Sequence, residues 1–363
     1  MLISVPRETK VHEYRVGLTP DSVASLTTAG HNVWVQNSAG QGVGFDDEDY
    51  RRAGARIVDL DDAFAGELVI KVKEPNLAEC ECLQSGQVLF TYLHLAAAPA
   101  IAAALVARGV VAIAYETVAD AAGHLPLLAP MSEVAGRMSV QVGANALQKA
   151  NGGRGTLLGG IPGVAPAYVV ILGGGMAGTN AAEMAIGLQA RVTILDRSIS
   201  QLRALNERFG VRAQVLMASE ENIANTVRDA DLVIGAVLVP GANAPKLVDR
   251  ALLRQMLPGA VLVDISIDQG GCFATSRPTT HDDPTYVEEG IVHYCVANMP
   301  GAVARTATIG LNNVTLPYVH ALANHGWRHA LDLDPGFAAG LNVAEGRVVH
   351  PAVADALSVG VAA

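Results

Sequence analysis

The chain is poor in charged residues and in cysteine, and each shortage excludes a class of protein. Only 17% of the 363 residues are charged, and acidic residues outnumber basic ones, 35 to 25. The formal net charge of −10 leaves no basic face for nucleic acid, because phosphate binding requires one. The four cysteines, Cys80, Cys82, Cys272 and Cys295, form neither a C-x-x-C pair nor a zinc spacing. They indicate reduced thiols in a cytoplasmic protein.

The chain also lacks a long uninterrupted hydrophobic run. Its most apolar region, 95–114, contains Pro99, Arg108 and Gly109 and falls short of the roughly 20 apolar residues of a membrane span. The N-terminus, MLISVPRETK, becomes polar within a few residues, which is not typical of a signal peptide. The histidines form no i, i+4 pair with a glutamate between them. We therefore expect no membrane partner and no metal site.

Short apolar runs alternate with helix-forming segments along most of the chain, and half of all residues are hydrophobic. This alternation predicts an α/β fold with doubly wound, mostly parallel sheets. The length suggests two domains. We place one domain at 129–305 and expect it to be inserted into a discontinuous domain made of 1–128 and 306–363. The last strand is expected at 291–296, and a helix at 314–325. The final segment is too short for a third domain and is expected to pack on the first.

The most informative stretch is 168–196, which has the pattern strand, glycine turn, helix, strand, acid. In the dinucleotide-binding fingerprint, Gly173 makes the tight turn, Gly175 allows a pyrophosphate to approach, and Gly178 packs the helix on the strand. The helix N-terminus offers N–H groups and a positive dipole to that pyrophosphate. Asp196 lies where an acid binds the adenosine ribose, which favours NAD over NADP, although the neighbouring Arg197 is able to accept a 2′-phosphate.

Charged or ionisable residues follow several strands of the first predicted domain. Arg15, Lys73, His94 and Glu116 all come after apolar runs, so in a parallel sheet they gather at one edge, where ligands bind. Solvated loop charges are the alternative explanation for each residue taken alone. In the second domain, Asp268 follows the strand 260–267. We expect the active site in the cleft between the two domains.

Several long motifs resemble one known family when taken in this order. They are PRETKVHEYRVGLTP (6–20), Lys73-Glu74-Pro75, Tyr92-Leu93-His94, the Gly173 fingerprint, LVIGAVLVPGANAPKLV (232–248), VLVDISIDQGGCFATSRPTT (261–280) and YCVANMPGAV (294–303). Over nearly its full length the chain resembles the bacterial alanine dehydrogenases, which belong with the nicotinamide nucleotide transhydrogenase alpha subunits. The resemblance implies two Rossmann-like domains, NAD-dependent oxidative deamination of L-alanine to pyruvate and ammonium, and a cytoplasmic homohexamer.

The resemblance also implies roles for individual residues. Arg15 and Lys73 would bind the substrate, and His94 with Asp268 would be the catalytic acid/base pair. The implied cofactor positions are Ser132, Gly173, Gly175, Met176, Ala177, Gly178, Asp196, Ser219, Val237, Leu238, Ile265, Ser266, Ile267, Asp268, Arg277, Val296, Ala297, Asn298 and Met299. Gln201 departs from the family, whose members often have a basic residue there, with Arg197 or Arg203 as substitutes. The match at Ser219 is offset by one residue from Ala218.

Two alternatives have different consequences. A transhydrogenase-like subunit would bind NAD(H) without any amino-acid substrate, as part of a membrane machine. An NAD-sensing protein would be non-catalytic and would not need the charged edge at Lys73 and His94. Turnover of L-alanine with NAD distinguishes both from a dehydrogenase.

Overall fold

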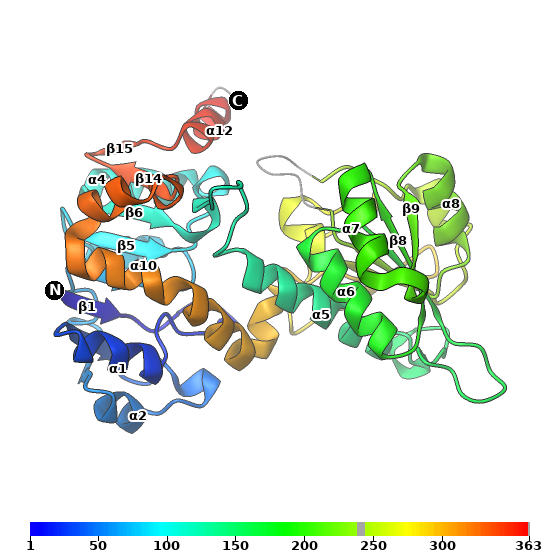
Figure 1. Cartoon of the computed structure of the whole chain (residues 1–363), viewed down its shortest axis with the longest axis horizontal. Coiled ribbons are helices and arrows are strands. Elements are labelled where there is room, and N and C mark those ends of the chain that lie inside the picture. Colours follow the sequence, from blue (N-terminus) through cyan, green and yellow to red (C-terminus); the bar gives the residue numbers. More distant parts are fainter. Residues whose placement is uncertain (238–243, 362–363) are drawn as a thin grey trace. The chain divides into compact units, whose positions relative to one another are not determined.

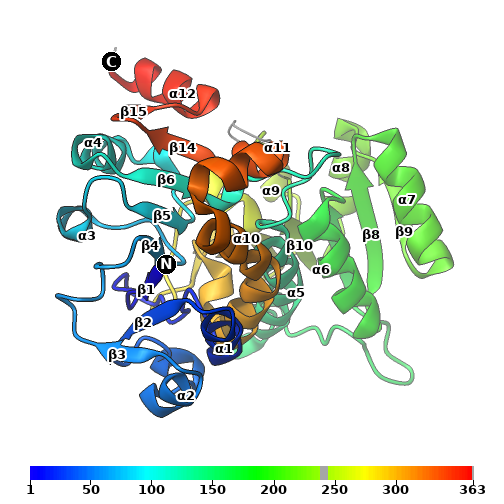
Figure 2. The same ribbon diagram turned by 60° about the vertical axis from the view of Figure 1, so that its left-hand side comes forward.

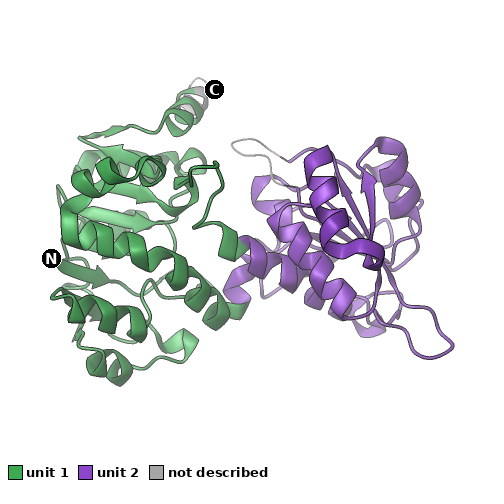
Figure 3. Ribbon diagram, in the orientation of Figure 1, with its two compact units in different colours: residues 1–131, 303–363 green, residues 132–302 purple. Residues whose placement is uncertain are grey.

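The computed structural model describes residues 1–237 and 244–361, which form two compact units (Figure 3). Unit 1 consists of residues 1–131 and 303–363, and unit 2 of residues 132–302. Unit 2 is therefore an insertion in unit 1. The sequence predicts boundaries at 128 and 306, and the compact units divide after residues 131 and 302.

Unit 1 is built on an eight-stranded sheet with the order β15-β14-β6-β5-β4-β1-β2-β3. The strands from β6 to β3 are parallel, as the β-α alternation predicts. The elements before the insertion are β1 (Leu2–Val5), α1 (Pro20–Thr28), β2 (Asn32–Gln36), α2 (Asp47–Arg52), β3 (Arg56–Val58), β4 (Leu68–Ile70), α3 (Leu77–Cys82), β5 (Val88–Thr91), α4 (Pro99–Arg108) and β6 (Val111–Ala114).

Alternate residues of these strands pack into two separate cores, one on each face of the sheet. Leu68 and Ile70 of β4 belong to the core that also contains α1 and α10 residues, whereas Val69 packs with residues of α3 and α4. Figure 2 shows α1 and α10 on one side of the sheet and α3 and α4 on the other. Both faces are covered, which suits the wholly apolar strands β4 (LVI) and β6 (VAIA).

The C-terminal segment returns to unit 1 and extends its sheet. It contains α10 (Ala304–Leu333), α11 (Pro335–Ala338), β14 (Leu341–Ala344), β15 (Arg347–Val348) and α12 (Pro351–Val361). β14 pairs antiparallel with β6, so the expectation that 291–296 is the last strand is wrong. The expected helix 314–325 is part of a longer helical segment that passes through Pro317 and is interrupted at Gly326, whose φ is 71°. The expected packing of this segment on the first domain is confirmed.

Helix α5 (Ala129–Ala146) leads into unit 2, whose seven-stranded sheet has the order β12-β13-β11-β10-β7-β8-β9. All pairs are parallel except β12 with β13. Figure 1 shows α6 and α7 covering one face of this sheet. The other elements are β7 (Tyr168–Leu172), α6 (Met176–Gly187), β8 (Arg191–Asp196), α7 (Ile199–Phe209), β9 (Gln214–Met217), α8 (Glu220–Arg228), β10 (Leu232–Gly235), α9 (Arg250–Leu253), β11 (Val261–Asp264), β12 (Thr285–Glu288) and β13 (Ile291–Tyr294).

The strand order reverses at β7, which lies between β10 and β8. In open α/β sheets such a switch point is where ligands bind, outside the carboxyl ends of the strands. Within the described part of the chain, no helix combines the length and the apolar character that crossing a bilayer requires.

Candidate functional site

Three polar residues of unit 1 follow the carboxyl ends of neighbouring parallel strands. β4, β5 and β6 lie side by side, and Lys73, His94 and Glu116 come within three residues of their respective ends. The structure therefore places these residues at one sheet edge, as expected from the sequence. The expectation that they act on a substrate remains a prediction.

His94 is held in an uncommon backbone conformation by Glu116. Its φ of 48° and ψ of 37° are left-handed, which costs a non-glycine residue about 1–2 kcal/mol. The Glu116 carboxylate accepts the His94 N–H at 2.7 Å and the Leu93 N–H at 3.2 Å. The imidazole Nδ1 lies 3.8 Å from Glu116 Oε1, and the ring stacks on Tyr92 with centroids 6.0 Å apart. Glu116 thus fixes where the half-exposed imidazole of His94 stands.

Arg15 is buried and bound by a neighbouring acid. Glu13 accepts hydrogen bonds from its Nε, at 2.6 Å, and from its Nη2, and Met131 Sδ lies 3.0 Å from its Nη1. Burial lowers the pKa of Arg15, but the bonds to Glu13 and the charges of Glu13 and Glu8 outweigh this effect and raise it. Glu13 uses the Nε–Nη2 edge of the guanidinium. Glu13 therefore fixes the plane of the guanidinium, and Nη1 lies against Met131.

The sheet edge of unit 2 forms a glycine cradle that fits a dinucleotide. Gly173 has a φ of 99°, which favours glycine, and a Cβ at Gly178 would lie 1.8 Å from the Gly173 carbonyl oxygen. A Cβ at Gly175 would meet nothing within 4 Å. Gly175 is also the N-cap of α6, and no side chain caps that helix. The first N–H groups of α6 are thus directed toward the place where a pyrophosphate would bind.

Asp196 ends the second strand of this motif and is tied to the glycine turn. Its carboxylate accepts the Gly174 N–H at 2.7 Å and the Ser198 N–H at 2.8 Å. Gln201, which departs from the family pattern, donates from Nε2 to the Gly174 carbonyl oxygen at 2.5 Å. Gln201, which stands where family members often have a basic residue, therefore supports the glycine turn at Gly174.

Asp268 lies in a short 3-10 helix, Ile265–Gln269, that a buried acid organises. Asp264 accepts the Ser266 N–H at 3.0 Å, the Cys272 N–H at 2.9 Å and the Ser276 hydroxyl. Burial raises the pKa of Asp264, and these hydrogen bonds oppose that rise. Ser266 in turn donates to the Val237 carbonyl oxygen at 2.7 Å. The exposed Asp268 therefore stands on a firmly held loop beside the Val237 segment.

The structure suggests other roles for some of the predicted cofactor residues. Ser219 is the N-cap of α8, where its hydroxyl accepts the Asn222 N–H at 3.2 Å. Arg277 stacks its guanidinium 4.0 Å from the ring centroid of Tyr286. Leu238 lies outside the described residues. Ser132, Met176, Ala177, Ile265, Ile267, Val296, Ala297, Asn298 and Met299 remain predictions. All except Ser132 lie in segments that follow β7, β11 and β13, at the same sheet edge as the glycine turn.

Two cavities lie in different units, and only one of them reaches a candidate site residue. One, of about 330 Å³, is lined by residues that include Arg7, Glu8, Glu13 and Arg15, and it reaches the substrate-binding candidate of unit 1. The other, of about 460 Å³, is lined by the residues that begin β7, β8 and β9. It lies at the amino ends of these strands, and the glycine cradle lies at their carboxyl ends. We assign no cofactor to it.

Sequence reasoning singled out Glu116, which holds His94, but gave no role to three other acids that hold candidate residues. Glu8 and Glu13 lie in the first loop, and Asp264 lies at the end of β11. The available signal was an acid in a predominantly apolar setting, as in VLVDISI, where the isolated charge of Asp264 needs partners if it is buried.

The fold and the glycine cradle define a Rossmann-type dinucleotide-binding α/β protein that also has a polar sheet edge in unit 1. The chain belongs to the alanine dehydrogenase/PNT family, whose N-terminal domain matches residues 4–135 and whose C-terminal domain matches residues 139–351. The resemblance inferred from the motifs is confirmed.

Relatives of known sequence and structure match nearly the whole chain. The alanine dehydrogenase of Halomonas elongata is 56% identical over 361 residues, which are 98% of this chain and 96% of the relative. That of Geobacillus stearothermophilus is 54% identical over 359 residues, covering 98% and 96%. A solved L-alanine dehydrogenase superimposes with a TM-score of 0.96 at 53% identity, covering 99% of both chains. A transhydrogenase from Sinorhizobium meliloti shares the fold, with a TM-score of 0.83 at 24% identity and coverage of 97% and 100%.

Proposed function

We propose that this chain is an NAD-dependent alanine dehydrogenase, which catalyses the reversible oxidative deamination of L-alanine to pyruvate and ammonium. The observation that carries the proposal is that one chain contains both a polar sheet edge and a glycine cradle for a dinucleotide. Unit 1 presents Arg15, Lys73 and His94, and unit 2 presents the glycine cradle and Asp268. Relatives above 50% identity over nearly the whole chain, named alanine dehydrogenases, support the same activity.

The substrate carboxylate is assigned to Arg15. A guanidinium binds a carboxylate through two parallel N–H bonds, and Glu13 keeps this side chain in one orientation. Lys73 supplies the second positive charge at the same edge. Its ammonium group polarises the carbonyl oxygen of pyruvate and stabilises negative charge that develops there. A small α-amino or α-keto acid fits this pair of cations.

Proton transfer is assigned to His94 and Asp268. Deamination requires a neutral amine before oxidation, then addition of water and departure of ammonia, and an imidazole is suited to such proton steps near neutral pH. Glu116 holds the imidazole at one position, so that a proton is exchanged at a fixed site. Asp268 shares the transfer or orients the attacking water. Single-turnover rates of His94→Ala and Asp268→Ala identify which of the two carries the proton.

NAD supplies the acceptor for the hydride from the alanine Cα. The open side of Gly175 and the uncapped start of α6 fit a pyrophosphate, which is the structural observation that favours a dinucleotide. We assign the ribose hydroxyls to Asp196 at the end of β8, and its charge would repel a 2′-phosphate. We therefore propose NAD over NADP, with Arg197 as the residue to mutate if NADP is used.

The deciding experiment is the absorbance of reduced nicotinamide with purified protein. L-Alanine is supplied first with NAD and then with NADP, and pyruvate with ammonium and NADH tests the reverse direction. We expect turnover with NAD in both directions. His94→Ala is expected to abolish it, whereas the matched control His329→Ala, an exposed histidine of α10, is expected to retain it.

Binding of NADH without turnover of L-alanine would contradict the proposal and favour the transhydrogenase-like or sensing alternatives. We also propose that the enzyme is a cytoplasmic homohexamer, as the family resemblance implies. Light scattering after size exclusion tests the oligomer, and a mass other than six times that of the chain would refute it.

A further inference from the structure

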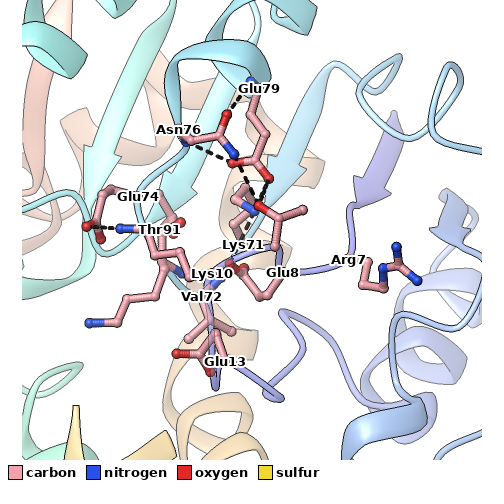
Figure 4. A network of polar contacts seen from close by, with 12 residues as sticks. Arg7, Glu8, Lys10, Glu13, Lys71, Val72, Glu74, Asn76, Glu79 and Thr91 are labelled. Carbon is pink, nitrogen blue, oxygen red and sulfur yellow. Dashed lines mark hydrogen bonds and ion pairs between the residues drawn. The ribbon is translucent and has the colours of Figure 1, made fainter. Parts of the chain in front are cut away.

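Beneath the unit 1 sheet edge lies a buried cluster of charges that the proposed mechanism does not use. Lys71 is fully buried, and its Nζ lies 3.3 Å from Glu8 Oε2 and 3.3 Å from Glu79 Oε1 (Figure 4). Glu8 comes from the loop after β1, Lys71 from the segment after β4, and Glu79 from the first turn of α3. The cluster therefore links three segments, two of which carry Arg15 and Lys73.

Burying this cluster costs desolvation free energy that apolar residues would not cost. Its two carboxylates and one ammonium group leave an excess negative charge in the interior, and burying each ion costs several kcal/mol after relaxation. Burial lowers the pKa of Lys71, but the charges of Glu8 and Glu79 and the hydrogen bonds to them raise it overall. Well-packed apolar residues of similar volume are often at least as stabilising as such ions. Stability alone therefore gives no reason for these charges to be buried here.

Glu8 differs from Glu79 in what else it holds. Glu8 Oε1 accepts the Val72 N–H at 2.7 Å and the Lys73 N–H at 3.4 Å. Glu79 instead accepts the Thr9 hydroxyl at 2.9 Å and the Asn76 N–H at 2.9 Å, in a capping box at the start of α3. Both acids contact the same lysine, but only Glu8 contacts the main chain of Lys73.

The Lys73 carbonyl is held from the other side of the residue. The buried Thr91 hydroxyl of β5 donates to the Lys73 carbonyl oxygen at 3.0 Å. The peptide N–H groups at Val72 and Lys73 bind to Glu8, and the carbonyl binds to Thr91. Pro75, two residues later, further limits the backbone. The backbone that carries the Lys73 side chain is thus held by Glu8 at its N–H groups and by Thr91 at its carbonyl oxygen.

We propose that Glu8, anchored by the buried Lys71, is a positioning residue that sets the main chain of Lys73 for substrate binding. This inference rests on the proposed function for the role of Lys73, but the contact itself is testable without any activity. The substitution Glu8→Gln leaves one carbonyl oxygen, and the amide nitrogen in place of the other oxygen faces a donor. Either Lys71 or the Val72 and Lys73 N–H groups lose their acceptor.

Three variants separate positioning from general stability. Glu8→Gln and Glu79→Gln each remove one negative charge beside Lys71, but only Glu8→Gln removes the charged acceptor of the Val72 and Lys73 N–H groups. Glu81→Gln is the matched control, because Glu81 is an exposed acid on the same helix as Glu79. For each protein we measure amide hydrogen exchange at residues 71–74, the KM for L-alanine and for pyruvate, kcat, and NADH affinity.

In Glu8→Gln we expect exchange at Val72 and Lys73 to accelerate about 10-fold or more, the typical effect of losing a hydrogen bond to a charged acceptor. The KM for L-alanine is expected to rise about 10-fold, with kcat changed less and NADH affinity unchanged. Glu79→Gln is expected to give a smaller rise in KM, and Glu81→Gln none. Equal effects of Glu8→Gln and Glu79→Gln on exchange and KM would overturn the proposal.

Thr91→Val keeps the test valid if Glu8→Gln does not fold. This nearly isosteric change removes the hydroxyl that binds the Lys73 carbonyl oxygen and leaves all charges in place. We expect the KM for L-alanine to rise about 3-fold, consistent with one neutral hydrogen bond. A KM equal to that of Glu81→Gln would overturn the positioning role. The unsubstituted protein could fail to turn over L-alanine while Glu8→Gln still exchanges faster at Val72 and Lys73. That outcome would support the contact and refute the proposed function.

Discussion

Substituting Gly178 by alanine tests the glycine cradle most directly. The added Cβ would lie 1.8 Å from the Gly173 carbonyl oxygen, and ordinary contacts begin at 3.4 Å. The start of α6 or the Gly173 turn must therefore shift by more than an ångström. A misplacement of about 1 Å can cost about 100-fold. We therefore expect Gly178→Ala to weaken NADH binding about 100-fold, which corresponds to about 2.7 kcal/mol of binding free energy. We also expect a stability loss of about 1–3 kcal/mol from overpacking.

Gly187 provides the matched control in the same helix. A Cβ at Gly187 meets nothing within 4 Å, so Gly187→Ala should bind NADH normally and gain about 0.5–1 kcal/mol of stability from reduced backbone entropy. NADH affinity is measured by fluorescence titration, and thermal unfolding with and without NADH separates weaker binding from loss of fold. If folded Gly178→Ala binds NADH as tightly as Gly187→Ala, the cradle does not hold the cofactor in the way argued here.

Three further predictions concern Glu116 and Arg15 of unit 1 and His293, a buried residue of β13. Glu116→Gln replaces the charged acceptor of the His94 N–H by a neutral amide, which costs about 1 kcal/mol, so kcat/KM for L-alanine should fall about 5-fold, and an unchanged value in steady-state kinetics would contradict this. Arg15→Lys removes the planar fork, so the KM for pyruvate should rise about 10-fold or more, and a smaller change would place the carboxylate elsewhere. Burial lowers the pKa of His293 below its ordinary 6.5, so below that pH the unfolded chain takes up a proton that the folded chain does not. The free energy of unfolding should therefore fall as the pH drops below 6.5, by at most about 1.4 kcal/mol per pH unit. Urea unfolding of His293→Asn between pH 7 and 5 should show a smaller loss, and an identical slope would refute this.

Local patterns were sufficient to predict the β-α alternation and the glycine turn. The run 168–172 and the glycines after it determine a strand, a turn and a helix through neighbours a few residues apart. Placing Lys73, His94 and Glu116 at one edge needed only the rule that parallel strands end together. In these cases backbone geometry follows from residues close in sequence.

Contacts between distant residues could not be predicted. Lys71 and Glu8 are separated by 63 positions, and nothing near either one indicates the other. The left-handed backbone of His94 depends on Glu116, 22 positions away. The strand β14 is only four residues long and finds its partner, β6, across the whole inserted unit. Helix α10 continues through Pro317 because tertiary packing outweighs local preference there.

The antiparallel pairing of β14 with β6 also constrains the order in which the chain can mature on the ribosome. Residues 132–302 are contiguous, so this unit has all of its strands as soon as it leaves the exit tunnel. The other unit must keep the edge of β6 unpaired until residues 341–344 are synthesised. During that interval the nascent protein presents an open strand edge of the kind that promotes aggregation. A pulse of limited proteolysis on stalled chains would show the inserted unit becoming resistant first.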